Sequence, residues 1–303
     1  NGEYIDADKL SVQPHDAGFL LGATVAEQVR TFGGRPFWLK QHLSRFFNGL
    51  RLARIESPVG KAKLHDAAMA VVANNYPLQS RMAPPASAIA SDIGITLFAT
   101  PGSYSSYGVE SGPVIAIHTY PLQFQLWADN YQSGRHAVIS PIREVPTDCW
   151  PKEIKCRSRM HYYLASKEAH ERSPGAVPIL LDHNHCVAET PIASIIAYFE
   201  NRGFVAPRQE KILPGVSLAY VKQLAAQWGI PFAHQDMTVE ELRSANEVLL
   251  TSTPFCVLPL TSIDGHHIGG TDRGTSMYTR VLQAWSHDVS VNIRKQAEDV
   301  AKT

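Results

Sequence analysis

The spacing of hydrophobic residues predicts a series of short elements in the first 120 residues. The segment ATVAEQVRTF is rich in β-branched residues and leads through Gly33-Gly34 into RPFWL, which predicts a β-hairpin. In KQHLSRFFNGLRLARI the apolar residues recur at helical spacing, and KAKLHDAAMAVVANNY repeats the pattern, so both predict helices. Three further segments predict strands: GEYID, IGITLFAT and PVIAIHTY.

The second part of the chain also mixes strands with helices. Residues 121–135 lack clear periodicity, so we expect a linker there, between a small α/β lobe (1–120) and a larger α/β lobe (136–303). A polar DHNH turn is expected to join PILL to CVAET in a hairpin. Helices are expected at MHYYLASKEAHER, SLAYVKQLAAQWG, VEELRSA and roughly 272–300, and other strands at HAVISPI, ASIIAYF, EVLLTST and VLPLTSIDG. The predicted fold class is therefore mixed α/β (α+β).

Composition narrows the possible partners. The 303 residues contain 28 Lys+Arg and 28 Asp+Glu, and this balance argues against nucleic acid or an anionic membrane as the main partner. No apolar run approaches the ~18 residues of a membrane span, and the polar stretch NGEYIDADKL does not have the pattern of a signal peptide. Four cysteines without a CxxC pair favour reduced thiols, so we expect a cytoplasmic protein.

Five local features could carry chemistry, and each also has an ordinary structural interpretation. A lysine such as Lys155 becomes nucleophilic when burial or a neighbouring cation lowers its pKa, but a basic patch before a helix is the commoner case. Glu189 could equally be a solvated residue at a strand end. The helix start in ILPGVS could bind phosphate or could simply be capped by Ser217. The hydroxyls of LLTST and Arg45 in HLSRF are likewise common turn and surface residues.

The order of these features resembles a known family. H-L-x-R is followed by I-K-x-x-x-R, then Glu189, then I-L-P-G-V-S, then T-S-T with a downstream L-P-L. This order, with the opening run HDAGFLLGATVAEQVRTFGG, resembles the class IV aminotransferases, pyridoxal-phosphate enzymes of fold type IV. The resemblance covers about residues 1–285 and implies two α/β lobes with the cofactor in the cleft between them, and a homodimer.

The resemblance also implies roles for individual residues. Lys155, rather than Lys152, would form the Schiff base with pyridoxal 5'-phosphate and carry the proton during transamination. Glu189 would face the pyridine nitrogen and keep it protonated. The remaining cofactor-binding residues that it implies are Leu213 against the ring and, around the phosphate, Arg45, Val216, Ser217, Ser252 and Thr253.

The substrate pocket departs from the family pattern. Ala26 replaces an aromatic residue, Pro101 replaces an arginine, Pro254 has no N–H to offer, and Ser194 replaces an asparagine. Three functions remain open: an aminotransferase acting on an amino acid, possibly branched-chain, and a 2-oxo acid; a lyase of the aminodeoxychorismate type that releases pyruvate; and a cofactor-binding protein with little catalysis. The amino donor, the acceptor and the preference for L or D substrates are not set by the sequence.

A metal site is the competing interpretation from another class. His183, His185 and Cys186 are close together in DHNHC, and His266-His267 follow later. Zinc ligands usually come as spaced pairs on defined turns, whereas both groups fall at predicted hairpin tips. We therefore expect exposed turn histidines and no metal.

Overall fold

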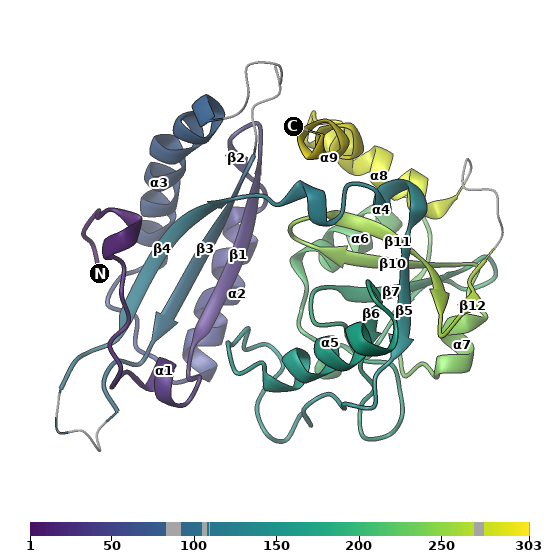
Figure 1. The fold of residues 1–303 in the computed structure, drawn as a ribbon, viewed down its shortest axis with the longest axis horizontal. Helices are drawn as coiled ribbons and strands as arrows, with labels where there is room; N and C mark the ends of the chain where they lie inside the picture. The colour runs from purple at the N-terminus through teal and green to yellow at the C-terminus, as the bar shows by residue number, and fades with distance from the viewer. Residues whose placement is uncertain (83–91, 105–107, 109, 270–275, 303) are drawn as a thin grey trace. The chain divides into compact units, whose positions relative to one another are not determined.

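The computed structural model describes residues 1–82, 92–104, 108, 110–269 and 276–302 (Figure 1). Contacts within the chain divide it into two compact units. The first comprises Asn1–Leu122 together with Glu153–Arg159, and the second comprises Gln123–Lys152 together with Met160–Thr303. Each unit has its own sheet, so the mixed α/β fold class is confirmed.

The described part of the first unit is built on an antiparallel sheet in the order β2-β1-β3-β4. Its hairpin joins β1 (Val25–Phe32) to β2 (Arg35–Pro36) through the two glycines, as predicted. The predicted strands at 93–100 and 113–120 are confirmed as β3 (Ile93–Thr100) and β4 (Val114–Pro121). The strand expected at residues 2–6 is wrong, because this exposed segment pairs with no strand in the described part of the chain, and a 3-10 turn, η1 (Ala7–Lys9), follows it.

Helices cover one face of this sheet. The amphipathic stripe of α2 (Leu39–Leu52) and the apolar residues of α3 (Lys61–Met82) pack against Val25 and Val29 of β1 and against β3. Side chains alternate along a strand, so Glu27, between these two valines, points to the same helix-covered face. A short helix, α1 (Ala17–Leu20), precedes β1 and is capped by Asp16.

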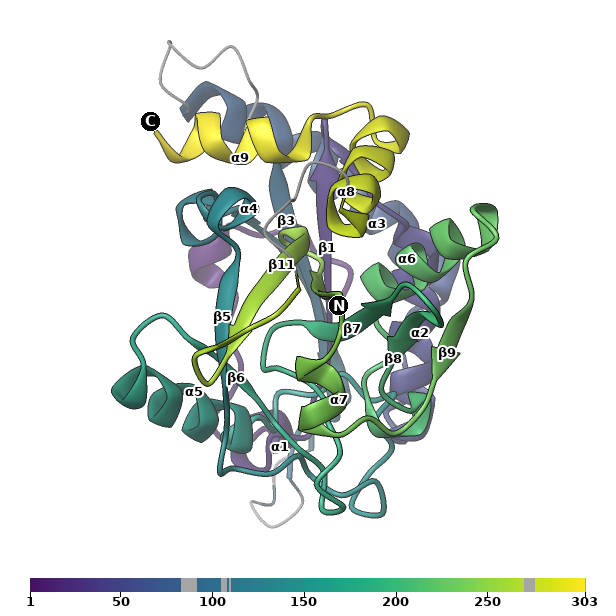
Figure 2. The same cartoon turned by 90° about the vertical axis from the view of Figure 1, so that its right-hand side faces the viewer.

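The second unit contains a larger mixed sheet in the order β6-β5-β11-β10-β7-β8-β9, with β12 beside β11, among the residues described. Figure 2 shows β5 next to β11, a parallel pair, and α5 beside β6. The strands are β5 (Arg135–Ile139), β6 (Val177–Ile179), β7 (Ser194–Phe199), β8 (Gly203–Ala206), β9 (Phe232–His234), β10 (Glu247–Ser252), β11 (Cys256–Ile263) and β12 (His266–His267).

The helices of the second unit match the predicted ones with two differences. A 3-10 turn and a short helix lie within residues 121–135, where the sequence led us to expect a linker. The single helix expected over roughly 272–300 is two helices, separated at Ser290, whose φ of 54° is left-handed. The start of that prediction, 272–275, lies outside the described residues. The helical elements are η3 (Phe124–Leu126), α4 (Asn130–Ser133), α5 (Met160–Arg172), η4 (Gln209–Lys211), α6 (Val216–Gln227), α7 (Val239–Arg243), α8 (Met277–Asp288) and α9 (Ile293–Ala301).

The segment that carries Lys155 contacts the first unit, although it lies between two stretches of the second. Ile154 packs against the core of the first unit, which accounts for this grouping. The sequence assigns Lys155 to the larger lobe instead, because periodicity carries no information about which sheet a loop contacts. The domain boundaries themselves stay a prediction, since grouping by contacts does not test independent folding. In the described ranges, no helix has both the length and the apolar character that a membrane crossing requires.

Candidate functional site

Lys155 is held in the first unit by its backbone. Its carbonyl oxygen accepts a hydrogen bond of 2.7 Å from the Ala26 amide at the start of β1. Two residues later, the Arg157 amide donates to the Thr24 hydroxyl at 2.8 Å. With Ile154 in the core on the other side, the lysine-bearing segment has a defined path along the edge of β1. Lys155 itself is half-buried there.

The surroundings of Lys155 make its neutral amine more accessible than that of an ordinary lysine. Burial lowers the pKa of Lys155 to about 8, and the Arg45 guanidinium acts in the same direction while Glu27 opposes it. At pH 7 this leaves about a tenth of the molecules with a free amine, compared with well under a thousandth for an ordinary lysine. Lys152 differs, because its ammonium is paired with Glu144 at 2.6 Å. Of these two lysines, Lys155 is the one suited to act as a nucleophile.

Arg45 lies on α2 and is bound by Glu27 of β1. Its Nε and Nη2 donate to the two oxygens of Glu27 at 2.8 and 2.6 Å, and His42 Nδ1 lies 3.1 Å from one of them. Burial alone would raise the pKa of Glu27, but Arg45 and then His42 outweigh burial and hold it well below its ordinary value. Burial lowers the pKa of His42. The structure thus brings Arg45 near Lys155, and Glu27 compensates the charge of Arg45.

Glu189 lies in the second unit and has a contrasting environment. One oxygen accepts a 3.0 Å hydrogen bond from the Leu213 amide and the other accepts a 3.2 Å bond from the Ser194 hydroxyl. Burial is the main cause that raises the pKa of Glu189 to about 7, and Glu144 adds to it, while these hydrogen bonds and Lys152 act in the opposite direction. Glu189 is therefore a buried acid without a directly bound cation among the contacts described.

The start of α6 lies next to this carboxylate. Leu213, which binds Glu189, is three residues before Val216, and a Cβ on Gly215 would stand 3.0 Å from the Ser194 hydroxyl. Gly215 is the N-cap and provides no side-chain bond to the first amides of the helix. Ser217 is buried inside the first turn and is not the N-cap, so the ordinary structural interpretation of this serine is wrong. Uncapped amides at a helix start attract anions.

The end of β10 meets the same region through the sheet. Thr251 pairs with Ser194 across the β10–β7 ladder, and Ser252 and Thr253 follow it into a tight turn. Thr251 Oγ1 is buried and makes no hydrogen bond to any residue described. An orphaned hydroxyl of this kind costs free energy unless a ligand or water satisfies it. The structure thus places Glu189 and Leu213 beside the start of β7, the end of β10 and the start of α6.

Sequence reasoning missed residues that organise these clusters. His42 opens the H-L-x-R motif but received no role, and Glu27 belongs to none of the motifs, although the alternation Val25-x-Glu27-x-Val29 could have located a carboxylate on the core face. Ser194 was noticed only as a departure from the family pattern. Its contact with Glu189 depends on the turn after Glu189, where Thr190 bonds back to Ala193 and reverses the chain.

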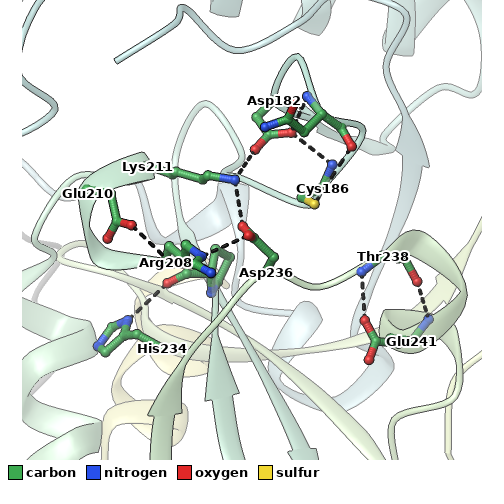
Figure 3. A network of polar contacts seen from close by, with 11 residues as sticks. Asp182, Cys186, Arg208, Glu210, Lys211, His234, Asp236, Thr238 and Glu241 are labelled. Atoms are coloured by element: carbon green, nitrogen blue, oxygen red, sulfur yellow. Dashed lines mark hydrogen bonds and ion pairs between the residues drawn. The ribbon is translucent and has the colours of Figure 1, made fainter. Parts of the chain in front are cut away.

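The structure also bears on a metal site. The side chains of Asp182, Cys186 and Asp236 approach closely enough to share an ion, but Lys211 donates to both carboxylates, at 2.5 and 2.6 Å (Figure 3). An ammonium thus provides the positive charge that a metal would supply. His185 instead has Arg143 Nη2 3.0 Å from its Nδ1. The expectation of no metal stays a prediction.

Comparison with known proteins agrees with the resemblance. Residues 24–263 match the family described as amino-transferase class IV. A D-alanine aminotransferase of Bacillus licheniformis is 26% identical over 273 residues, covering 89% of each chain.

Solved structures share the fold. A branched-chain aminotransferase of Thermoproteus uzoniensis superposes with a TM-score of 0.81 at 21% identity, covering 99% of this chain and 95% of the other. A 4-amino-4-deoxychorismate lyase of Pseudomonas aeruginosa gives a TM-score of 0.75 at 22% identity, covering 92% and 95%. The family match spans most of the sequence and includes Lys155 and Glu189. The chain belongs to the amino-transferase class IV family.

Proposed function

We propose that this protein is a pyridoxal-phosphate-dependent aminotransferase that moves an amino group between an amino acid and a 2-oxo acid through Lys155. The observation that carries the proposal is the state of Glu189. A buried carboxylate that receives hydrogen bonds only from an amide and a hydroxyl, among the residues described, is unfavourable by itself. A protonated ring nitrogen would supply the missing positive charge, and the pyridinium of pyridoxal phosphate has this chemistry.

Other groups of the second unit fit the same cofactor. Val216 and Ser217 offer amides at an uncapped helix start, which suits a phosphate. The turn with Ser252 and Thr253 adds hydroxyls and follows the orphaned Thr251 hydroxyl. Leu213 is the apolar residue beside Glu189 and would pack on the ring. When bound, pyridoxal phosphate supplies a carbonyl that condenses with amines and a ring that accepts the electron pair released at the substrate carbon.

In the first unit, Lys155 would react with the cofactor and transfer a proton, and Arg45 would contact the cofactor phosphate. Lys155 Nζ, with its lowered pKa, is neutral often enough to act as a nucleophile and, once released, to accept and return a proton. Arg45 would contribute charge to the phosphate while Glu27 keeps its guanidinium oriented. Glu189, by holding a proton at the ring nitrogen, would preserve the ring as an electron acceptor.

The substrate pocket and the assembly belong to the same proposal. The curated relative is named for D-alanine and a similar structure for branched-chain substrates, and both names describe aminotransferases. We therefore expect a small amino acid as donor, a 2-oxo acid as acceptor, a homodimer and a cytoplasmic location. The departures at Ala26, Pro101 and Pro254 lead us to expect a carboxylate grip different from that of the D-alanine enzymes.

A half-reaction tests the function. The cofactor-loaded protein would be mixed separately with L- and D-amino acids, without an acceptor, and followed by visible absorbance and by mass analysis of the product. An aminotransferase should convert at least one amino acid to its 2-oxo acid and retain the amino group on the cofactor. Release of pyruvate from aminodeoxychorismate, with no amino group retained from any donor, would establish the lyase instead.

A further inference from the structure

Glu144 is a buried carboxylate that the proposed chemistry does not use. It lies in the loop between β5 and the lysine-bearing segment and is 5% exposed. Its Oε1 accepts a 2.6 Å bond from Lys152 Nζ, and His161 Nε2 lies 3.2 Å from the same atom. Burial alone would raise the pKa of Glu144, but His161 and Lys152 together outweigh burial and lower it to about 2, so Glu144 is ionised at neutral pH.

The two partners of Glu144 flank the lysine-bearing segment. The chain leaves the second unit after Lys152, passes through Glu153–Arg159 in the first unit, and re-enters the second unit at Met160, one residue before His161. A single oxygen atom of Glu144 therefore contacts both ends of the excursion that carries Lys155. The Lys152 contact is a short hydrogen bond between charged groups, whereas His161 Nε2 is close to the same oxygen but makes no hydrogen bond to any residue described. The Lys152 bond therefore holds one end of the excursion, and the His161 side chain packs at the other.

Glu144 is itself fixed to the segment that follows β6, next to Glu189. Its amide donates to the Leu181 carbonyl at 2.9 Å, and the neighbouring Leu180 amide donates to the Glu189 carbonyl at 2.9 Å. Backbone hydrogen bonds thus connect Glu144 and the candidate ring-binding carboxylate through Leu180 and Leu181. Glu144 and Lys152 also act in opposite directions on the pKa of Glu189.

Stability alone does not account for this arrangement. Glu144 Oε2 is buried and accepts no hydrogen bond from the residues described. Buried ion pairs often contribute little net stability compared with apolar replacements, whereas they can fix one geometry among several. Glu144 Oε1 lies close to Lys152 before Lys155 and to His161 after it, which is consistent with a role in fixing the path of the chain.

We propose that Glu144 is a positioning residue for Lys155, because it closes the two ends of the segment Glu153–Arg159 onto one carboxylate oxygen. The role in catalysis rests on the proposed function. Replacement of Glu144 would leave the Lys152 ammonium without its partner and release one end of the segment. Two amides report on the path of that segment in the first unit: Ala26, which donates to Lys155, and Arg157, which donates to Thr24.

Hydrogen exchange of the cofactor-free protein tests the proposal. In Glu144→Gln we expect the Ala26 and Arg157 amides to exchange at least tenfold faster, while the amides of β3 keep their wild-type rates. The matched control is Asp182→Asn, which alters another buried carboxylate bound by a lysine, at 2.5 Å from Lys211, and has neither Lys152 nor His161 among its described contacts. Equal exchange of the two reporter amides in wild type, Glu144→Gln and the control would overturn the proposal.

A double variant separates positioning from general destabilisation. Glu144→Gln with Lys152→Met removes both charges, so the midpoint of unfolding should recover while the reporter amides stay fast. Recovery of both would show that Glu144 only stabilises the unit and would contradict the proposal. In the loaded enzyme, Glu144→Gln should lower kcat about tenfold and leave KM nearly unchanged. The exchange experiment needs neither cofactor nor substrate, so it tests the positioning role of Glu144 independently of the proposed function. Unchanged exchange would overturn the positioning role even if wild-type Lys155 binds the cofactor. Faster exchange would support the positioning role even if Lys155 does not bind the cofactor.

Discussion

Glu27 in the first unit and Glu189 in the second are both buried carboxylates, with 0% and 7% of their surfaces exposed. Arg45 donates two hydrogen bonds to Glu27, whereas Glu189 receives one from an amide and one from a hydroxyl. Their pKa values consequently shift in opposite directions. Burial alone therefore does not identify a functional acid, and the difference lies in whether the protein supplies the counter-charge.

Removing the counter-charge of Glu27 should have the largest effect. Arg45→Met leaves an ionised carboxylate buried beside His42, and breaking such a pair costs about 3–5 kcal/mol of unfolding free energy. Denaturant unfolding at pH 7 measures the loss. The pair of changes Arg45→Met and Glu27→Gln should restore most of it. A single variant as stable as wild type would show that Glu27 is not dependent on Arg45.

Removing the charge of Glu189 should stabilise the protein, whereas removing the partner of Glu27 should destabilise it. The pKa of Glu189 is about 7 in the folded protein and 4.5 ordinarily, so the folded state binds more protons between these values and stability falls as pH rises through them. The loss of stability caused by ionised Glu189 is fully present above pH 7. Glu189→Gln should therefore stabilise the cofactor-free protein by roughly 1–3 kcal/mol at pH 8 and by almost nothing below pH 4.5.

Thermal unfolding across this pH range measures the Glu189 effect. The matched control is Glu27→Gln, which should destabilise at every pH above 4.5, because the lowered pKa of Glu27 makes its ionised form the stabilising one. Stabilisation by both substitutions, or by neither, would remove the contrast between the two carboxylates.

Weakening one donor to Glu189 should have the smallest effect. Ser194→Ala removes the 3.2 Å hydroxyl contact, so the charged form of Glu189 loses one partner and its pKa rises further. We expect about 0.5–1 kcal/mol less stability at pH 8 and a smaller change at pH 5, where the carboxyl is protonated. A loss of the same size at both pH values would assign Ser194 to packing alone.

The sequence anticipates the elements of this fold better than its clusters. The hydrophobic spacing correctly predicts α2 and α5, because one face of each helix meets a core, and β-branched residues before a Gly-Gly turn correctly predict β1. Short strands such as β8 and β9 escape detection, since four or three residues are too few to show a period. The expected strand CVAET forms only an isolated bridge, Leu181↔Val187, after its predicted turn.

The candidate site is harder to anticipate for a similar reason. The order of motifs points to Lys155 and Glu189, and the structure gives each a setting that suits its expected role. Their supporting residues come from distant parts of the chain. Glu27 is 18 positions from Arg45, and Glu189 is 24 positions from Leu213. Pairings of this kind depend on which strand faces which helix, and no local pattern encodes that.

Borohydride reduction of the cofactor-loaded wild-type protein, followed by proteolysis and mass mapping, identifies the lysine that binds the cofactor. Borohydride makes a lysine–pyridoxal linkage permanent, so the modified residue can be identified. We expect one pyridoxyl adduct, on Lys155, with none on Lys152 because Glu144 holds that ammonium. Lys155→Ala should abolish the adduct, while Lys222→Ala, at an exposed site, should not. An adduct on Lys152, or no adduct with the loaded protein, would contradict the account.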